Sequence, residues 1–250
     1  MSDAEELKEA AIRTKQILQE MRRQGITHVP GTGRAEPAGA QTELFPAGSA
    51  APQPAKTLSL SEKQAVLEPV RLQAMDCQLC KLCKGRHSVV FGDGSLVARL
   101  VFVGEGRGRD EDAQGVPFVG AAGQLLNKII AAMKMTRPEV YICNIVKCRP
   151  PNNRPPEPDE VAACMPYLEQ QLATIQPKVI CALGKTAAAA LLETQAPMGA
   201  LRGRTFERNG IPLIVTYHPA YLLRNPAAKK DVWEDIQLLM KEMGLKKAES

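Results

Sequence analysis

The sequence predicts an α/β fold of three α/β/α layers, with a central, mainly parallel, four-stranded sheet. Two observations support this prediction. Beyond residue 95, short apolar runs alternate with amphipathic stretches, which is typical of parallel strands joined by helices that cover both faces of the sheet. In addition, 250 residues with 44% hydrophobic content are enough for one core of ordinary size plus extensions.

Each expected strand is followed by an expected helix. The strands are ARLVFVG at 98–104, EVYICNIV at 139–146, KVICALG at 178–184 and IPLIVTYH at 211–218, and the helices span 121–134, 158–174, 185–193 and 230–242. In such sheets, ligands bind at the carboxyl ends of the strands. Those ends read GEGRGRDED, NIVKC, GKT and HPAYLLRN, so unusual polar residues stand where a site is expected.

The chain before this region predicts two further parts. Residues 1–25 are expected to form an N-terminal helix, because strong helix formers fill positions 3–24 and Gly25 follows them as a stop. Residues 26–60 are expected to be a disordered linker, because their Pro, Ala and Gly cannot bury enough apolar surface to offset the ordering entropy. The globular domain is expected at 61–245, beginning with a short helix near Ser61.

Composition narrows the compartment and the partners. The charged N-terminus lacks the apolar segment of a signal peptide, and no apolar run approaches about 18 residues, so a cytoplasmic protein without a membrane span is expected. The formal net charge of +5 permits a polyanionic partner such as nucleic acid. Because structural disulfides are rare in a reducing compartment, the seven cysteines are interpreted as metal ligands and buried thiols.

Three cysteines lie close together in CQLCKLCKGRH: Cys77, Cys80 and Cys83. Cys-x2-Cys is a usual half-site for zinc or an iron–sulfur cluster. Two completions are open at this point: a local site would add His87, and a remote site would join the first two cysteines to Cys148 and Cys164. Two other cysteines fall inside expected strands and are interpreted as buried core thiols: Cys143 and Cys181.

The stretch GEGRGRDEDAQGVPFVG follows the first expected strand. It has arginine at 109, where a dinucleotide-binding fingerprint needs glycine, and the chain carries no G-x-x-x-x-G-K-S/T motif. Its carboxylates disfavour a triphosphate, so a base or a sugar is the expected ligand. His218, Asn144 and Phe118 lie near the same edge and are candidate site residues, although each also has an ordinary structural interpretation.

From about Leu72 to Leu239, the chain resembles the iron–sulfur (family 4) uracil-DNA glycosylases. The matching segments include CQLC, VVFGDG, GEGRGRDEDAQGVPFVGAAGQLLN, VYICNIVKCRPPNNRPP and HPAYLLRNP, in the family's order. The resemblance implies a uracil-glycosylase fold, removal of uracil from DNA in base excision repair, and a 4Fe-4S cluster. The cluster ligands that it implies are Cys77, Cys80, Cys148 and Cys164.

The same resemblance implies roles at the pocket. His218 and the backbone N–H groups around Glu105 and Gly106 would meet uracil O2, where negative charge develops as the glycosidic bond breaks. Asn144 would donate to and accept from the O4/N3 edge, which the reversed pattern of cytosine would frustrate. Phe118 would stack on the flipped ring.

Further residues are expected around this pocket. Glu111 would shape it near C5 and help exclude thymine. Leu222, Leu223 and Arg224 would fill the space that the flipped nucleotide leaves in the DNA. The family's G-E-x-P-G motif has Arg107 here in place of proline, and a phosphate contact is expected for this arginine.

A rival function class is a non-catalytic iron–sulfur or zinc module that recognises damaged DNA without cleaving it; a single-turnover assay would separate the two. QTELFP, at 41–46, resembles the Q-x-x-L-F peptides that dock on bacterial sliding clamps, with Gln41, Leu44 and Phe45 as contacts. A monomer in the bacterial cytoplasm, associated with the nucleoid, is expected.

Overall fold

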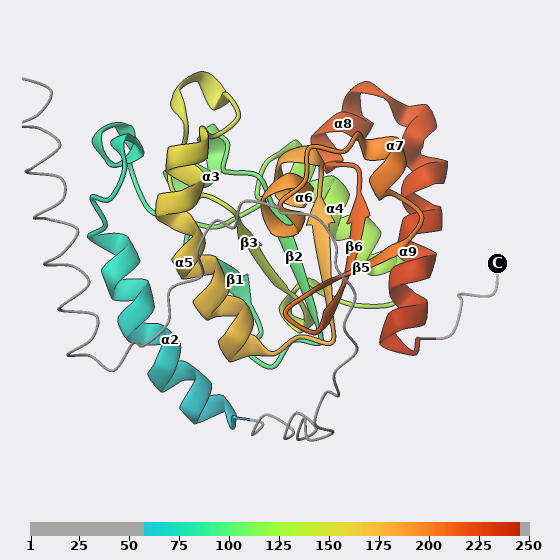
Figure 1. The fold of residues 1–250 in the computed structure, drawn as a ribbon, viewed down its shortest axis with the longest axis horizontal. Helices are drawn as coiled ribbons and strands as arrows, with labels where there is room; N and C mark the ends of the chain where they lie inside the picture. Colours follow the sequence, from blue (N-terminus) through green and yellow to red (C-terminus); the bar gives the residue numbers. More distant parts are fainter. Residues whose placement is uncertain (1–57, 246–250) are drawn as a thin grey trace, which may run out of the picture. The chain divides into compact units, whose positions relative to one another are not determined.

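The computed structural model describes residues 58–245, and Figure 1 shows how their elements are arranged. The expected N-terminal helix at 1–25, nearly all of the expected linker at 26–60, and Gln41, Leu44 and Phe45 lie outside the described residues. The structure therefore concerns the domain expected at 61–245.

Six strands of the described chain form one sheet, in the order β1-β3-β2-β4-β6-β5. Their bounds are Asp93–Gly94 for β1, Leu100–Gly104 for β2, Tyr141–Asn144 for β3, Val179–Leu183 for β4, Thr205–Arg208 for β5 and Ile211–Thr216 for β6. The central strands β3, β2, β4 and β6 are parallel neighbours, which confirms the predicted four-stranded parallel sheet. β1 and β5 extend it with antiparallel edges.

The two edge strands escape prediction because neither contains an apolar run. β1 has two residues, and the side chains of β5 alternate between exposed and half-buried. The turn between β5 and β6 contains Asn209 and Gly210, with φ of 50° and 78°. Asn-Gly between two strands is a strong hairpin signal, so this dipeptide, and not hydropathy, reveals β5 in the sequence.

Helices cover both faces of the sheet, giving the three predicted layers (Figure 1). α2, α5 and α6 pack on one face against residues such as Val101 and Ile180, and α4 and α9 pack on the other against residues such as Phe102 and Cys181. The α-helices span Leu60–Met75 (α2), Arg109–Gln114 (α3), Ala121–Ala132 (α4), Pro158–Ile175 (α5), Lys185–Leu192 (α6), Met198–Leu201 (α7), Pro219–Arg224 (α8) and Lys229–Met243 (α9). Short 3-10 helices span Lys81–Gly85 (η1), Arg137–Glu139 (η2), Pro151–Asn153 (η3) and Pro226–Ala228 (η4).

The strand order positions the site. From β2 the chain crosses to β3 on one side and later returns to β4 on the other side of β2. A crevice opens at the carboxyl edge wherever the winding direction reverses in this way. The loops that follow β2, β3, β4 and β6 meet at this edge, as the sequence predicts.

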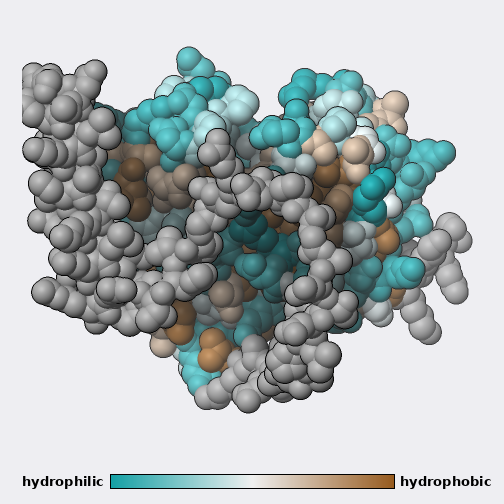
Figure 2. Space-filling model, viewed as in Figure 1, coloured by the Kyte–Doolittle hydropathy of each residue, from teal (hydrophilic) through white to brown (hydrophobic). Residues whose placement is uncertain are grey.

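No helix in residues 58–245 is long and apolar enough to cross a membrane. On the face shown in Figure 2, the regions of α8 and of the loop leading into α5 present a largely hydrophilic surface at the top of the view.

Candidate active site

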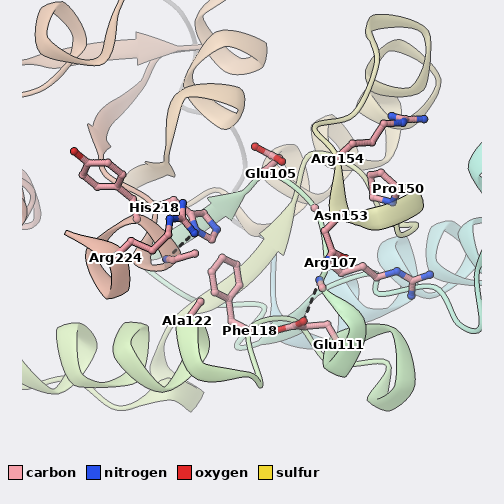
Figure 3. A pocket seen from close by; sticks show the side chains of 14 residues that line it. Glu105, Arg107, Glu111, Phe118, Ala122, Pro150, Asn153, Arg154, His218 and Arg224 are labelled. Atoms are coloured by element: carbon pink, nitrogen blue, oxygen red, sulfur yellow. Dashed lines mark hydrogen bonds between the residues drawn. The ribbon is translucent and has the colours of Figure 1, made fainter. Parts of the chain in front are cut away.

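A cavity of about 440 Å³ lies at the carboxyl edge of the sheet. Its walls come from the loop after β2 with α3, the start of α4, the loop after β3, and α8 (Figure 3). Six of the predicted site residues line it: Glu105, Gly106, Glu111, Phe118, His218 and Arg224. Segments far apart in the sequence thus bring most of the predicted residues together.

His218 is held as a neutral hydrogen-bond donor. It caps the N-terminus of α8, where its Nδ1 accepts a hydrogen bond from the Ala220 N–H at 3.1 Å. Burial of the ring, aided by the charge of Arg224 and opposed by Glu111, lowers the pKa of His218 to about 4. Since Nδ1 accepts and the ring is neutral, the proton resides on Nε2, which is free to donate to a ligand.

Two neighbours set the position of the His218 ring. Phe118 contacts it, with 5.4 Å between ring centroids and 34° between ring planes. On the other side, Gly184 has φ of +90°, and a Cβ there would stand 3.0 Å from the Cβ of His218. A side chain at position 184 would therefore strain the backbone and push His218 out of place.

Phe118 is buried and has a left-handed backbone, with φ of 54°. This conformation is costly for a phenylalanine, and strain of this kind persists where the surroundings enforce it. Arg137 does so here, because its Nη1 donates to the Phe118 carbonyl at 3.2 Å and its Nη2 to the Pro117 carbonyl at 2.5 Å. Gly123 leaves room for the turn, since a Cβ there would lie 1.8 Å from the Phe118 carbonyl oxygen.

Arg137 is a site residue that sequence reasoning missed. It lies outside the apolar and cysteine motifs, and all its side-chain partners come from other segments: the Pro117 and Phe118 carbonyls, Asn127 Oδ1 and Asp93 Oδ2, so no local pattern reveals it.

Asn144 is the last residue of β3, close to Gly104 and the ring of Phe118. It is buried, and neither its Oδ1 nor its Nδ2 has a hydrogen-bond partner among the described residues. A Cβ at Gly104 would meet the Asn144 Oδ1 at 2.4 Å and the Phe118 Cζ at 2.7 Å, so glycine is required between them. Asn144 is not among the residues that line the cavity, although a Cβ on Gly104 would meet both its Oδ1 and the Phe118 ring, so the amide and the ring lie close to the same glycine. Leaving a buried amide unpaired costs about 1–3 kcal/mol, which is typical of a group kept for a ligand.

The carboxylates of the site are engaged with the protein. Glu111 Oε2 accepts from the Gly108 N–H at 3.0 Å, and its Oε1 accepts from the N–H groups of Val119 and Gly120, both at 3.2 Å. Glu111 therefore holds the loop after β2 against the start of α4, and it also lines the cavity. Glu105 Oε2 accepts a hydrogen bond from Thr186 Oγ1 of α6.

The structure corrects the predicted DNA wedge. Leu222 is 1% exposed and packs in the core beneath α8, so it cannot enter the DNA. Leu223 is 49% exposed, and Arg224 is exposed and lines the cavity. Successive helical residues point in different directions, and this decides which leucine is available.

Arg107 is also corrected. Its guanidinium is fully buried, where Nη2 pairs with the Asp112 carboxylate at 2.8 Å and Nη1 donates to Ser88 Oγ at 3.0 Å. In Figure 3 its side chain points away from His218 and Phe118. A phosphate contact by Arg107 is therefore excluded in this arrangement.

A second, smaller pocket lies between α2, η1, the segment after β3 and α5. Its lining contains five cysteines: Cys77, Cys80, Cys83, Cys148 and Cys164. The remote pair predicted from the sequence thus joins the first group, whereas His87 of the local alternative does not line the pocket. Cys143 and Cys181 are buried in strands, as predicted.

Two hydrogen-bond donors approach the sulfur atoms of this pocket. The backbone N–H of Lys147 donates to Cys164 Sγ at 3.2 Å, and Arg86 Nη1 approaches Cys148 Sγ at 3.5 Å while donating to the Cys77 carbonyl at 2.6 Å. Burial raises the pKa of the Cys164 thiol to about 11, because the thiolate is poorly solvated there.

In residues 58–245, no group of three or more His, Cys, Asp or Glu side chains is arranged to hold a metal ion.

The protein has three α/β/α layers, a cavity at the carboxyl edge of its parallel strands, and a pocket of cysteines beside that cavity. These features define a class of α/β enzyme whose site suits a small planar ring. Comparison with known proteins shows which ring this is. Residues 91–237 match the Uracil DNA glycosylase superfamily. The type-4 uracil-DNA glycosylase of Thermotoga maritima is 44% identical over 179 residues, which cover 70% of this chain and 93% of that protein. The type-4 enzyme of Saccharolobus solfataricus is 40% identical over 189 residues, covering 72% and 88%.

The chain belongs to the type-4 family of the uracil-DNA glycosylase superfamily. It is a DNA-repair hydrolase that removes uracil from DNA, and this family membership replaces the rival interpretation of a non-catalytic DNA-binding module.

Proposed function

We propose that His218, Asn144 and Phe118 carry out recognition and excision of a uracil flipped into the cavity. Breaking the glycosidic bond leaves negative charge on uracil, chiefly at O2 and N1, and an oxocarbenium-like sugar that water captures. A neutral imidazole whose Nε2–H is already fixed can stabilise that charge without reorganisation, and such a donor contributes about 3–4 kcal/mol. Protonation of uracil by His218 is not required by this arrangement.

The observation that carries the proposal is the unpaired amide of Asn144. Its Nδ2 and Oδ1 are buried without partners in the described structure, beside the ring of Phe118. Uracil offers an acceptor at O4 next to a donor at N3, so one amide can satisfy both and in turn be satisfied. Cytosine offers a donor next to an acceptor and would leave like groups facing each other.

A hydrogen bond from Lys147 holds the backbone at Asn144. Lys147, itself buried, donates from Nζ to the Asn144 carbonyl at 2.9 Å and to Gln171 Oε1 at 2.5 Å. Gln171 belongs to α5 and donates further to the Phe91 carbonyl at 2.8 Å. These bonds fix the end of β3, so the amide is presented at a constant position, as recognition of one base edge requires.

Entry of the nucleotide requires that the target leave the base stack, at a cost of a few kcal/mol. Leu223, half exposed on α8, is suited to occupy the vacated space, and Arg224, beside the cavity, to contact phosphate. Phe118 would provide the face on which uracil stacks.

Cys77, Cys80, Cys148 and Cys164 are proposed to hold a 4Fe-4S cluster, with Cys83 as a nearby thiol. When bound, the cluster would act as a covalent staple between the segment before η1, the start of the loop after β3, and α5. Asp112 connects that region to the cavity wall. Its Oδ1 accepts from the backbone N–H of His87 at 3.1 Å, in the segment after the first cysteines, and pairs with Nη2 of Arg107, a residue of the cavity wall, at 2.8 Å.

The finer expectations about context remain proposals. A monomer, a place in the bacterial cytoplasm near the nucleoid, and docking of Gln41, Leu44 and Phe45 on a sliding clamp rest on sequence alone, and the clamp peptide lies outside the described residues.

The test is a single-turnover assay with excess enzyme on an oligonucleotide that contains one uracil, and on the same oligonucleotide with thymine. We expect alkali-labile abasic sites only from uracil, and their loss in Asn144→Ala. Asn209→Ala, in the exposed β5–β6 turn, is the matched control and should retain the rate. Equal cleavage of both oligonucleotides, or full activity of Asn144→Ala, would contradict the proposed recognition.

A further inference from the structure

Tyr221 lines the cavity and is the outermost of three stacked side chains that the excision mechanism does not use. Its ring stacks on that of Tyr217, with 4.7 Å between centroids and 27° between the ring planes. The guanidinium of Arg202 lies 4.6 Å from the Tyr217 ring centroid. Arg202 is in turn fixed by Asp235 at 2.7 Å, a carboxylate with 0% exposure. The stack is therefore anchored in the core.

Arg202 and Asp235 anchor one end of the stack, whereas Tyr221 at the other end is exposed. Tyr221 is 37% exposed, although one side of its ring is packed on Tyr217, and it lines the cavity together with His218 and Arg224. Its backbone is fixed as well, because its N–H donates to the His218 carbonyl at 2.8 Å in the first turn of α8. The ring is thus held in one place relative to the residue that meets uracil.

A preorganised aromatic ring at the cavity can stack on a base that flanks the flipped nucleotide. When a nucleotide flips into the cavity, the two bases that flanked it each lose a stacking neighbour. A rigid ring replaces that neighbour at low entropic cost, because little side-chain freedom remains to be lost. Every base has a π-face, so the contact does not depend on sequence, and Arg224 next to it is placed for the adjoining phosphate.

We propose that Tyr221 is a stacking platform for one nucleobase that flanks the flipped deoxyuridine. The inference rests on the uracil-DNA glycosylase activity and adds a base-binding subsite outside the uracil pocket. Tyr217 and Arg202 are positioning residues for it, since they touch Tyr221 or one another and not the DNA. The subsite is distinct from the space filled by Leu223, which replaces the flipped nucleotide itself.

The experiment is a thermodynamic cycle between the ring and the base. The probes are single-stranded oligonucleotides with a 2′-fluoro deoxyuridine, which binds but resists cleavage, and with an abasic sugar on the 5′ side, on the 3′ side, or on neither. Dissociation constants are measured by fluorescence anisotropy at one salt concentration. For the wild type, loss of the correct flanking base should weaken binding about 5- to 150-fold, the range for one base–aromatic stack.

Variants of Tyr221 show whether its ring makes the contact with the flanking base. Tyr221→Ala should bind the intact probe more weakly by the same factor and be insensitive to loss of the flanking base. Tyr221→Phe and Tyr221→Trp should behave as the wild type, because the ring and not the hydroxyl makes the contact. Leu72→Ala, an exposed apolar residue of α2 outside the cavity, is the control and should keep the full sensitivity.

A second readout separates stacking from a structural effect. A 2-aminopurine in the flanking position should be quenched on binding to the wild type and to Tyr221→Phe, and should stay bright with Tyr221→Ala. If Tyr221→Ala melts at a lower temperature than the wild type, Tyr221→Leu, which keeps the bulk without a π-face, replaces it. A coupling of at least about fivefold on one side supports the platform. Smaller coupling on both sides, or quenching unchanged in the variant, overturns it.

Discussion

Replacing Asp112 by alanine should destabilise the folded protein by about 3–5 kcal/mol, because a buried guanidinium would lose its carboxylate. The side chains of Arg107 and Asp112 are 0% and 2% exposed, and their charged atoms are 2.8 Å apart. Without Asp112, Arg107 would keep only the bond from Nη1 to Ser88 Oγ among the partners described, and its Nε and Nη2 would face the interior unpaired. Water cannot replace the lost partner there at low cost.

Replacing Arg107 by methionine should cost less. Asp112 would keep the N–H groups of His87 at 3.1 Å and Ser88 at 3.4 Å, and Arg149 lies 4.0 Å from its other oxygen. We expect about 1–3 kcal/mol, the cost of a buried polar group that is partly satisfied. In the double variant the two losses should not add, since each single change already breaks the same ion pair.

The assay is urea unfolding of proteins with equal iron content, followed by the fluorescence of Trp233, the single tryptophan. Thermal unfolding is a check, because about 3–5 kcal/mol corresponds to a Tm lower by about 6–20 °C for a domain of this size. The salt dependence of DNA binding should be unchanged in Arg107→Met, because the guanidinium does not reach phosphate. A cost below about 1 kcal/mol for Asp112→Ala, or additive losses in the double variant, would refute the reasoning.

Five further outcomes are expected. His218→Ala and Asn144→Ala should each slow uracil release in single turnover by about 100-fold or more with little change in DNA affinity, since both act on the flipped base; equal losses of rate and affinity would indicate a structural role. Since the folded-state pKa of His218 is about 4, its ring stays neutral from pH 8 to about pH 5. The titration of His218 should therefore not change the single-turnover rate at saturating enzyme over that range. A rate that followed a group titrating near pH 6.5 would contradict this. The same depressed pKa means that the contribution of His218 to stability is fully present above about pH 6.5 and is lost as pH falls towards 4. Acid unfolding of the wild type and of His218→Ala measures this contribution. Cys148→Ala should lose the broad absorption near about 400 nm and the iron, about four per chain, while Cys83→Ala keeps both; the reverse would favour a local site. A peptide of residues 36–50 should bind the host's sliding clamp saturably in calorimetry, and its failure to do so would end the docking hypothesis.

The order of strands and helices, and the edge at which the site lies, could be predicted from the sequence alone. Burial on both faces requires continuous apolar runs such as LVFV and VICAL, and amphipathic helices repeat every 3.6 residues, so these elements are encoded locally. Cysteine spacing likewise limited the metal centre to two arrangements. The β5–β6 hairpin was encoded too, in the dipeptide Asn209-Gly210, but not in hydropathy.

The tertiary structure decided which side chains the site can use. Arg107 and Arg224 are equally charged in the sequence, yet one is buried against Asp112 and the other is exposed at the cavity. Leu222 and Leu223 are identical neighbours, and the pitch of α8 buries the first and exposes the second. Arg137 supports Phe118, and Cys148 meets Cys77, only after distant segments pack together. A local pattern specifies how a segment folds because it depends on neighbours along the chain, whereas the direction and partners of a polar side chain depend on segments that folding brings beside it.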